Sequence, residues 1–410
     1  MKRIFLILIS IICLFSAFGK KNTTSNKTNV PFYVNPGIES YGTDPGASPE
    51  VISQRLEALG SEIDLRYNAE VQKYIDVYMK NGRRQVTTFQ ILAAYYLPIF
   101  EKAIADAGLP DELKYIPFIE SGLDAKATSY AGAGGLWQIM PSVARGYDMK
   151  VNGTIDERRD PYIASQRACI MLKKAYEKFG DWGLALASYN CGSGTLGKAL
   201  KRAGGECNDF WSVYNYLPAQ TRHYVPKFIA MVYVMNYYAE HNIPEVKVAQ
   251  YAADTIRISE KMSIKNLSSM FGVSVADLKA LNPHFSTDAI PGTVSRPCNV
   301  ILPLGAVLAY REYRDLPDFM KNDESSRLLI ASANAAPVAV SAANKGSEKR
   351  HNPNADNYYD EESSTFPGTY IRKVKTPQSA NAVRRGETGR GAGMPDEDPD
   401  DTFSFIQSIL

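Results

Sequence analysis

The sequence predicts a predominantly α-helical domain, followed by a small α+β module and a disordered C-terminal tail. Three observations support this order. Before residue 250, apolar residues recur at helical spacing, and no stretch alternates with the period of two that marks a half-buried strand. A strand–helix–helix–strand pattern then occupies residues 255–302. Beyond residue 321 the periodicity ends, and Ala/Ser-rich and charged stretches predict a segment without a packed core.

Length and composition place the chain among ordinary globular proteins. Its 410 residues suffice for two or three domains, and 45% of them are apolar and 22% charged. The 46 Lys and Arg residues nearly balance the 44 Asp and Glu residues, which gives a formal charge of +2. Nucleic-acid-binding proteins carry a basic surplus or a clustered basic face, so we expect no nucleic acid partner.

Residues 1–19 have the pattern of a signal peptide. Two basic residues precede an apolar run over residues 4–15, and Ala-Phe-Gly at 17–19 offers the small-x-small pattern that a signal peptidase accepts. Because the run is short for a hydrocarbon core of about 30 Å, a retained membrane anchor is the weaker alternative. Lipidation at Cys13 is also disfavoured, since the residue before it is not small. We predict an exported protein of the periplasm or cell envelope, with peripheral membrane association left open.

The helical domain is predicted over residues 51–245, behind a linker over 20–50 that is rich in Asn, Thr, Ser, Pro and Gly. Apolar residues at helical spacing predict helices over 51–65, 71–78, 87–107, 163–179, 183–188 and 224–240. A Gly-Leu-Pro sequence at 108–110 marks the end of the third of them. This density of amphipathic segments is typical of a helical domain with one apolar core.

The α+β module is predicted over residues 250–305. Its elements, in order, are a strand over 255–259, helices over 264–271 and 275–281, and a strand over 299–302. Residues 321–410 are the low-complexity tail, which combines a basic pair, an acidic run and Ala/Ser-rich stretches. We therefore expect two folded parts in one chain.

Cleavage of the signal peptide removes Cys13 and leaves Cys169, Cys191, Cys207 and Cys298. In an oxidising compartment these four allow three full disulfide pairings, which the sequence cannot rank, and buried thiols are the other interpretation. None of them has CxxC spacing or nearby histidines. We therefore expect no zinc site and no cofactor.

The stretch from Ile116 to Pro141 carries the most informative side chains. Glu120 directly follows four apolar residues, and burial against apolar walls raises the pKa of a carboxyl group. A glutamic acid that stays protonated near neutral pH can donate a proton to a glycosidic oxygen. Taken alone, a glutamate at a helix end or in an ion pair is the more common explanation. Asp124 is a candidate for a second carboxylate.

The residues after Glu120 favour a site that binds a sugar. Ser129 supplies a hydroxyl group, and the glycine cluster at 132–135 allows the backbone to approach a partner closely. Trp137 and Gln138 then supply an aromatic ring and an amide, which sugar-binding sites commonly use. The ordered set predicts a carbohydrate site built around Glu120.

These motifs resemble the lytic murein transglycosylases of the soluble-lytic-transglycosylase type. The Glu-Ser pair of that family matches Glu120-Ser121, and its GLxQ segment matches residues 135–138. Its Ala-Tyr-Asn motif matches residues 188–190, where Ser188 replaces the usual alanine. The order and spacing of all three motifs agree with the family.

Two further stretches resemble one subgroup of that family, the one typified by membrane-bound lytic murein transglycosylase D. They are Glu-Arg-Arg-Asp-Pro at 157–161 and Thr-Arg-His-Tyr-Val-Pro-Lys at 221–227. Trp137, where many relatives carry methionine, also fits this subgroup. The resemblance covers residues 50–245.

The resemblance implies a lysozyme-like domain that cleaves the β-1,4 bond between N-acetylmuramic acid and N-acetylglucosamine. It implies that Glu120 protonates the leaving oxygen and then accepts a proton from the muramoyl C6 hydroxyl. That hydroxyl attacks C1, which gives a 1,6-anhydro product without water. A second carboxylate, which most glycosidases need, is then unnecessary, and Asp124 is structural. The residues implied to bind substrate are Ser129, Gln138, Met140, Tyr189, Asn190 and Tyr224.

Two alternative functions stay open at this point. One is a hydrolytic muramidase, which uses water as the nucleophile. The other is a non-catalytic peptidoglycan-binding protein that kept the fold, although the presence of Glu120 together with Gln138, Tyr189 and Tyr224 argues against it. In each case the expected partner is the glycan strand of peptidoglycan, and the sequence indicates no particular protein partner.

Residues 254–304 resemble a LysM module, a small fold that binds glycans containing N-acetylglucosamine. Residues 271–283 match its middle, whereas 259–262 depart from the Gly-Asp-Thr turn expected at its opening. The module is therefore predicted to be degenerate, either a second glycan-binding site or a structural appendage. Since every matched catalytic position precedes residue 230, we expect removal of residues 250–410 to spare cleavage of soluble glycan fragments and to reduce cleavage of intact sacculi.

Overall fold

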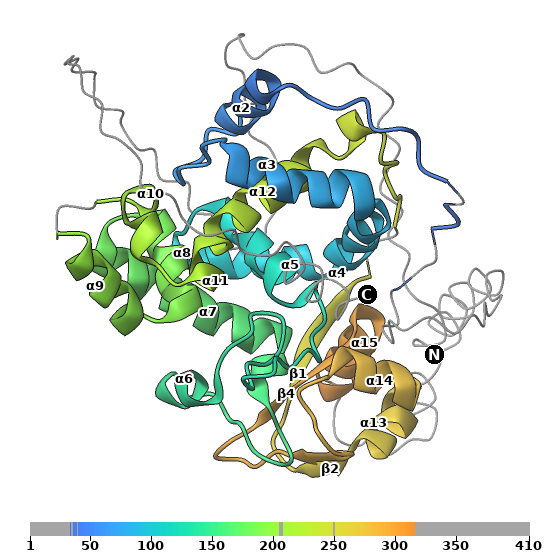
Figure 1. Ribbon diagram of the computed structural model, residues 1–410. Coiled ribbons are helices and arrows are strands. Elements are labelled where there is room, and N and C mark those ends of the chain that lie inside the picture. The colour runs from blue at the N-terminus through green and yellow to red at the C-terminus, as the bar shows by residue number, and fades with distance from the viewer. Residues whose placement is uncertain (1–32, 34–35, 39, 205–207, 249–250, 316–410) are drawn as a thin grey trace, which may run out of the picture. The chain divides into compact units, whose positions relative to one another are not determined.

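The computed structural model describes residues 33, 36–38, 40–204, 208–248 and 251–315, all within the first of two compact units, Met1–Ala342. The predicted signal peptide at 1–19 and the predicted tail at 321–410 lie outside these residues. Figure 1 shows helices through the first part of the described chain and a module that contains strands after them. The predicted order, a mostly helical domain before an α+β module, is confirmed.

The helical domain consists mainly of α-helices joined by short turns. Its α-helices are α2 (Pro49–Glu57), α3 (Ala69–Asp76), α4 (Arg83–Ala107), α5 (Ile116–Ser121), α6 (Pro141–Gly146), α7 (Pro161–Phe179), α8 (Trp182–Cys191), α9 (Ser193–Arg202), α10 (Phe210–Val213), α11 (Ala219–Arg222) and α12 (Tyr224–Tyr237). Shorter helical turns are η1 (Val77–Asn81), η2 (Asp111–Tyr115), η3 (Glu157–Arg159), η4 (Tyr214–Tyr216) and η5 (Ala239–His241).

Local sequence signals explain where these helices begin and end. Asp160 caps α7, because its Oδ1 accepts hydrogen bonds from the backbone N–H groups of Tyr162 and Ile163. Gly180, with φ of +73°, ends the same helix in the left-handed conformation that glycine adopts without strain. The predicted helix over 51–65 is wrong in length, since α2 ends at Glu57 and its apolar pattern continues in a loop.

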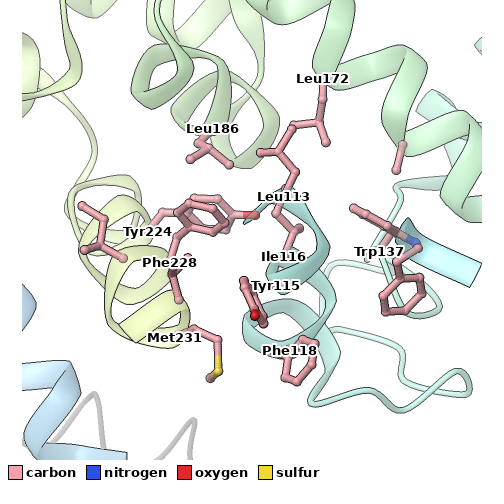
Figure 2. Packing of buried hydrophobic residues seen from close by; sticks show 14 of the residues in the cluster. Leu113, Tyr115, Ile116, Phe118, Trp137, Leu172, Leu186, Tyr224, Phe228 and Met231 are labelled. Atoms are coloured by element: carbon pink, nitrogen blue, oxygen red, sulfur yellow. The ribbon is translucent and has the colours of Figure 1, made fainter. Parts of the chain in front are cut away.

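The apolar core of the helical domain is built around α12. The residues from Phe228 to Val234 are fully buried, which fits a helix that is apolar on all sides. α12 packs against α3, α5 and α8. Figure 2 shows Tyr224, Phe228 and Met231 of α12 facing the segment that carries Tyr115 and the start of α5. The core therefore fixes α5 and α12 against each other.

The α+β module confirms its predicted elements. Strand β1 (Ala253–Ile258) pairs antiparallel with β4 (Cys298–Pro303), and β2 (Lys261–Ser263) pairs with β3 (Ala289–Pro291). Helices α13 (Ile264–Phe271) and α14 (Val275–Leu281) have the predicted bounds, and α15 (Leu304–Asp315) follows the last strand. Together these elements enclose a second apolar core.

The core of the helical domain and the core of the module each contain side chains from the other part. Ile155, from the loop before α7, is buried in the core of the module. In return, Leu281 and Ile301 of the module belong to the core of the helical domain. The module is therefore packed against the helical domain through apolar side chains from both sides, which a flexibly tethered appendage would lack.

The end of the predicted linker is also part of the folded domain. The Arg83 guanidinium donates to the carbonyl oxygen of Gly42 at 2.8 Å, and the Tyr41 and Thr87 hydroxyls are 2.9 Å apart. Asp44 lies 2.8 Å from Nδ1 of the buried His241. The folded domain therefore begins before residue 51. The sequence pattern placed its start at residue 51.

Three of the cysteines are free thiols. Cys169 and Cys298 are buried and Cys191 is partly exposed, so no disulfide joins these three residues. Cys207 lies outside the described residues. Burial raises the pKa of the Cys169 thiol to about 12, which makes it a poor nucleophile. Within the described ranges, the helices are too short or too polar to cross a membrane.

Candidate active site

Glu120 is the penultimate residue of the short helix α5. Pro117 stands in the first turn of the helix. Gly122, with φ of +60°, follows Ser121 and ends the helix. The buried Ser121 hydroxyl lies 3.0 Å from the carbonyl oxygen of Pro117 and 2.9 Å from that of Leu136. It can donate to either oxygen, and so it links the end of α5 to the glycine-rich loop.

The Glu120 carboxyl group is held by a phenol from α12. The Tyr224 hydroxyl donates to Glu120 Oε1 at 2.6 Å. Burial raises the pKa of Glu120 to about 7, although the Tyr224 hydrogen bond and the positive charge of Lys227 act in the opposite direction. A carboxyl group with this pKa exists in both protonation states near neutral pH, as a group that acts as both acid and base requires.

Helix α8 supplies a second phenol close to the same carboxyl group. Burial and the nearby charge of Glu120 hold the pKa of Tyr189 well above its usual value, so this phenol stays neutral. The Tyr189 hydroxyl donates to the carbonyl oxygen of Trp137 at 2.8 Å. Its neighbour Asn190 accepts at Oδ1 from the Thr221 hydroxyl at 2.9 Å, which fixes the orientation of the amide. The site thus combines one carboxyl group with two neutral phenols.

The loop from Ala127 to Ile139, here called the glycine loop, follows α5 in the chain and contacts both α5 and α8. Ser129 Oγ accepts from the backbone N–H of Ala133 at 3.0 Å, which leaves the hydroxyl proton free to donate. The Gln138 side chain donates to the Gly135 carbonyl oxygen at 2.8 Å, and its own backbone has φ of +47°. Its amide therefore also stabilises the loop. Met140 follows the loop with an exposed side chain.

Trp137 does not have the predicted role in sugar binding. Its side chain is 0% exposed, and its indole N–H donates to Ser165 Oγ on α7 at 2.9 Å. The ring packs edge-to-face against Phe100 of α4, with ring centroids 5.5 Å apart. The expectation from the sequence is therefore wrong, because the side chain of Trp137 points into the core and only its carbonyl oxygen meets Tyr189.

Asp124 is not part of the site. Its side chain is exposed and accepts from the backbone N–H of Lys126 at 2.7 Å, which is a local turn contact. Among the residues that the structure describes, no three His, Cys, Asp or Glu side chains come together as a metal site. Of the two carboxyl groups considered from the sequence, only that of Glu120 belongs to the site.

Lys227 closes the 221–227 motif, but the sequence analysis gave it no role in the site. It lies one helical turn after Tyr224 on α12, and its ammonium group is 5.4 Å from the centre of the Tyr74 ring. Burial lowers the pKa of Lys227, whereas the nearby Glu120 raises it. The signal available in the sequence was the spacing of three between Tyr224 and Lys227, which places both on one helix face.

Comparisons with known proteins agree with the geometry. Residues 98–210 match the family model described as the transglycosylase SLT domain. Residues 252–317 match the model described as the LysM-like domain of lytic transglycosylase MltD. The chain thus contains a region that matches the SLT domain, followed by one that matches a LysM-like domain, in the order that its motifs predict.

Individual relatives cover part of the chain. It is similar to membrane-bound lytic murein transglycosylase D of Escherichia coli K12, with 31% identity over 220 residues, which are 52% of this chain and 48% of that protein. A putative tributyltin chloride resistance protein of Alteromonas sp. strain M-1 is 30% identical over 127 residues, or 31% of this chain and 60% of that one. The chain spans about half the length of the first of these relatives.

A solved structure is also similar to part of the chain. The 70-kDa soluble lytic transglycosylase of Escherichia coli is 19% identical, with a TM-score of 0.32, and the match covers 45% of this chain and 33% of that one.

Proposed function

We propose that this protein is a peptidoglycan lytic transglycosylase, which cleaves the β-1,4 bond between N-acetylmuramic acid and N-acetylglucosamine during cell-wall turnover and remodelling. The observation that carries the proposal is the Glu120 carboxyl group, which has a pKa of about 7 and is held by the neutral Tyr224 hydroxyl. The matches to the SLT and LysM-like domain families support the same substrate class.

In the proposed reaction Glu120 acts first as an acid and then as a base. Its protonated form gives the proton to the oxygen of the leaving N-acetylglucosamine as the C1–O bond breaks. The resulting carboxylate takes the proton of the muramoyl C6 hydroxyl while O6 forms a new bond to C1. The product is a 1,6-anhydromuramoyl end, and no water is consumed. Attack by a hydroxyl of the same sugar also gains from proximity.

The neighbouring groups assist each stage. The Tyr224 hydroxyl fixes Oε1, so that Oε2 is directed to the substrate. The positive charge of Lys227 stabilises the carboxylate that forms in the first stage. Ser129 is proposed to donate to the N-acetyl group. Gln138, Met140, Tyr189 and Asn190 are proposed to line the path of the glycan.

The proposed location is the periplasm or cell envelope. The signal-peptide pattern at 1–19 supports export, and peptidoglycan lies outside the cytoplasmic membrane. A relative that is 31% identical is described as membrane-bound, which supports a site of action at the envelope. Peripheral attachment to the membrane is compatible with both observations.

Mass spectrometry of digested sacculi tests the proposal. The wild-type protein should release muropeptides with 1,6-anhydro ends, and Glu120→Gln should release none above background. Products heavier by one water would instead assign a hydrolytic muramidase. Binding to sacculi without product release would assign a peptidoglycan-binding protein, and either result would overturn the proposal.

A further inference from the structure

The LysM-like module forms backbone hydrogen bonds with a hairpin of the helical domain. The hairpin is closed by a bridge between Val151 and Asp156, and Ile155 forms an antiparallel bridge with Phe285 of the module. The backbone N–H of Asp156 donates to the carbonyl oxygen of His284 at 2.8 Å. On the other side of the bridge, the N–H of residue 286 donates to the carbonyl oxygen of residue 154 at 2.9 Å. The module therefore extends this hairpin.

A buried pair of side chains faces across the joint. His284 and Asp160 are each 1% exposed, and their Nδ1 and Oδ2 atoms are 3.9 Å apart. Neither atom has a hydrogen-bond partner within the described part of the chain. The other ring nitrogen of His284 lies 3.2 Å from the carbonyl oxygen of Asn299, and the other carboxylate oxygen of Asp160 caps α7. Each side chain thus has a hydrogen bond within its own domain, and the two side chains face each other at the joint.

Arg158 connects this hairpin to the glycine loop. Its Nε and Nη2 donate to the two carboxylate oxygens of Asp156 at 2.9 and 2.8 Å, which is the bidentate geometry. Its Nη1 donates to the carbonyl oxygens of Gly132 at 2.7 Å and Ile139 at 3.0 Å. One buried guanidinium therefore holds two distant points of the loop while Asp156 fixes the guanidinium itself.

The loop is packed tightly against this support. A Cβ atom on Gly135 would overlap the carbonyl oxygen of Arg158, and one on Gly134 would lie 2.9 Å from the guanidinium carbon. The loop in turn contacts the site, because Tyr189 donates to the carbonyl oxygen of Trp137. Contacts therefore run from the backbone carbonyl oxygen of His284, through Asp156 and Arg158, to the loop beside Glu120.

We propose that the LysM-like module positions the glycine loop, with His284 and Arg158 as positioning residues for the reaction. This inference rests on the proposed function for its effect on rate, but the mechanical coupling is independent of it. The module then contributes to cleavage even of glycans too short to reach it. Loosening the joint lets the loop move away from the place where Ser129 and Gln138 meet the sugar, and small displacements at a site cost large factors in rate.

Hydrogen–deuterium exchange on the full-length protein tests the coupling without any substrate. His284→Gln keeps a donor for the Asn299 carbonyl oxygen and removes the ring atom that faces Asp160. We expect the amides of residues 127–139 to exchange about tenfold faster in this variant. Lys265→Gln, on the exposed face of α13, is the matched control and should leave them unchanged. Unchanged exchange at 127–139 in a folded His284→Gln protein would overturn the proposal.

Arg158→Lys tests the same coupling from within the helical domain. Lysine keeps the charge but lacks the planar fork, so it cannot hold Asp156 and two carbonyl oxygens together. We expect faster exchange of the loop amides in this variant as well, and Arg145→Lys on the exposed side of α6 is its control. If Arg158→Lys leaves the exchange of the loop unchanged, the loop is held independently and the proposal fails.

Kinetics on a soluble tetrasaccharide then separate positioning from general support of the fold. We expect kcat of His284→Gln to fall about tenfold while KM changes less than about threefold. The circular dichroism spectrum at the assay temperature should match wild type. A fall in kcat that simply matches the loss of folded protein seen by circular dichroism would overturn the proposal. If the wild-type protein releases no anhydro product, the proposed function fails, whereas the exchange experiment still decides the coupling.

Discussion

The two sides of the Glu120 site are stabilised in different ways. On the helical side, Glu120 and Tyr224 stand on α5 and α12, which are fixed by the apolar core. On the loop side, Leu136 and Trp137 of the glycine loop enter the same core, but the loop is also braced at Gly132 and Ile139 by hydrogen bonds from one guanidinium, that of Arg158. Apolar packing is spread over many contacts, whereas a polar brace depends on a few atoms. Substitutions on the helical side should therefore change the chemistry, and those on the loop side should change stability and geometry.

The largest expected effect lies on the helical side. Glu120→Gln should lower the rate of anhydro-muropeptide release by about 10²–10⁴-fold, because an amide cannot donate and then accept the proton. The melting temperature should not fall. Asp124→Asn is the matched control on the exposed turn nearby and should keep near wild-type activity. Release by Glu120→Gln at near wild-type rate would contradict the assignment of Glu120.

The largest expected loss of stability lies on the loop side. Gly135→Ala should destabilise the protein by roughly 3 kcal/mol or more, since residue 135 has φ of +78° and its new Cβ would overlap the Arg158 carbonyl oxygen. Urea denaturation measures the change. Gly153→Ala, at a hairpin glycine with no neighbouring atom within 4 Å, should change stability by less than about 0.5 kcal/mol. Equal effects of the two substitutions would show that the loop is not packed against Arg158.

The raised pKa of Glu120 predicts a pH dependence of stability. The folded protein holds this proton up to about pH 7, whereas the unfolded chain releases it near pH 4.5. The unfolded state therefore binds fewer protons between these values, and the free energy of unfolding falls as pH rises through this window. Glu120→Gln removes this loss, so it should be more stable than wild type by up to about 3 kcal/mol above pH 7 and nearly equal at pH 4. A stability difference that is constant from pH 4 to 8 would contradict the raised pKa.

The smallest expected effect comes from removing the Tyr224 hydroxyl, which distinguishes the role of this phenol from that of the Glu120 carboxyl group. Tyr224→Phe removes a hydrogen bond that lowers the pKa of Glu120, so the alkaline limb of the kcat profile should move upward by about one pH unit. At its optimum, kcat should fall about tenfold, because the carboxyl group loses one fixed oxygen. Tyr216→Phe, on the exposed turn η4, is the control. An unmoved alkaline limb would mean that Tyr224 does not set the pKa of Glu120.

Periodicity predicted the elements well where each one carries its own signal. Helices α13 and α14 have the predicted bounds, since an amphipathic pattern, a serine N-cap and a following breaker define each of them locally. Helix α4 begins at Arg83, four residues before the predicted start, because its first turn contains few apolar residues. The short helix α5 carries Glu120 yet was not predicted as an element, since six residues hold too little periodicity.

The arrangement of the site depended on contacts that periodicity does not encode. Glu120 and Tyr224 are far apart in the chain, and the sequence placed Tyr224 only among the substrate-binding residues, whereas in the structure its hydroxyl donates to Glu120. The inward orientation of Trp137 could not be predicted, because a loop residue has no repeating face. The joint between Asp156 and His284 was missed for the same reason, since it links two turns. From the sequence, removal of residues 250–410 is expected to spare cleavage of short fragments. The coupling proposed through this joint predicts the opposite result.

The bridge between Ile155 and Phe285 also constrains the order in which parts of the chain fold. These two residues are 130 positions apart, so the bridge closes a long loop and can form only after residue 285 has left the ribosome. At about 5–20 residues per second, the hairpin waits on the order of ten seconds for its partner to be synthesised. During that interval Ile155 has no core to enter, and the support of the glycine loop is incomplete. We therefore expect the protein to acquire full activity only once the module has folded.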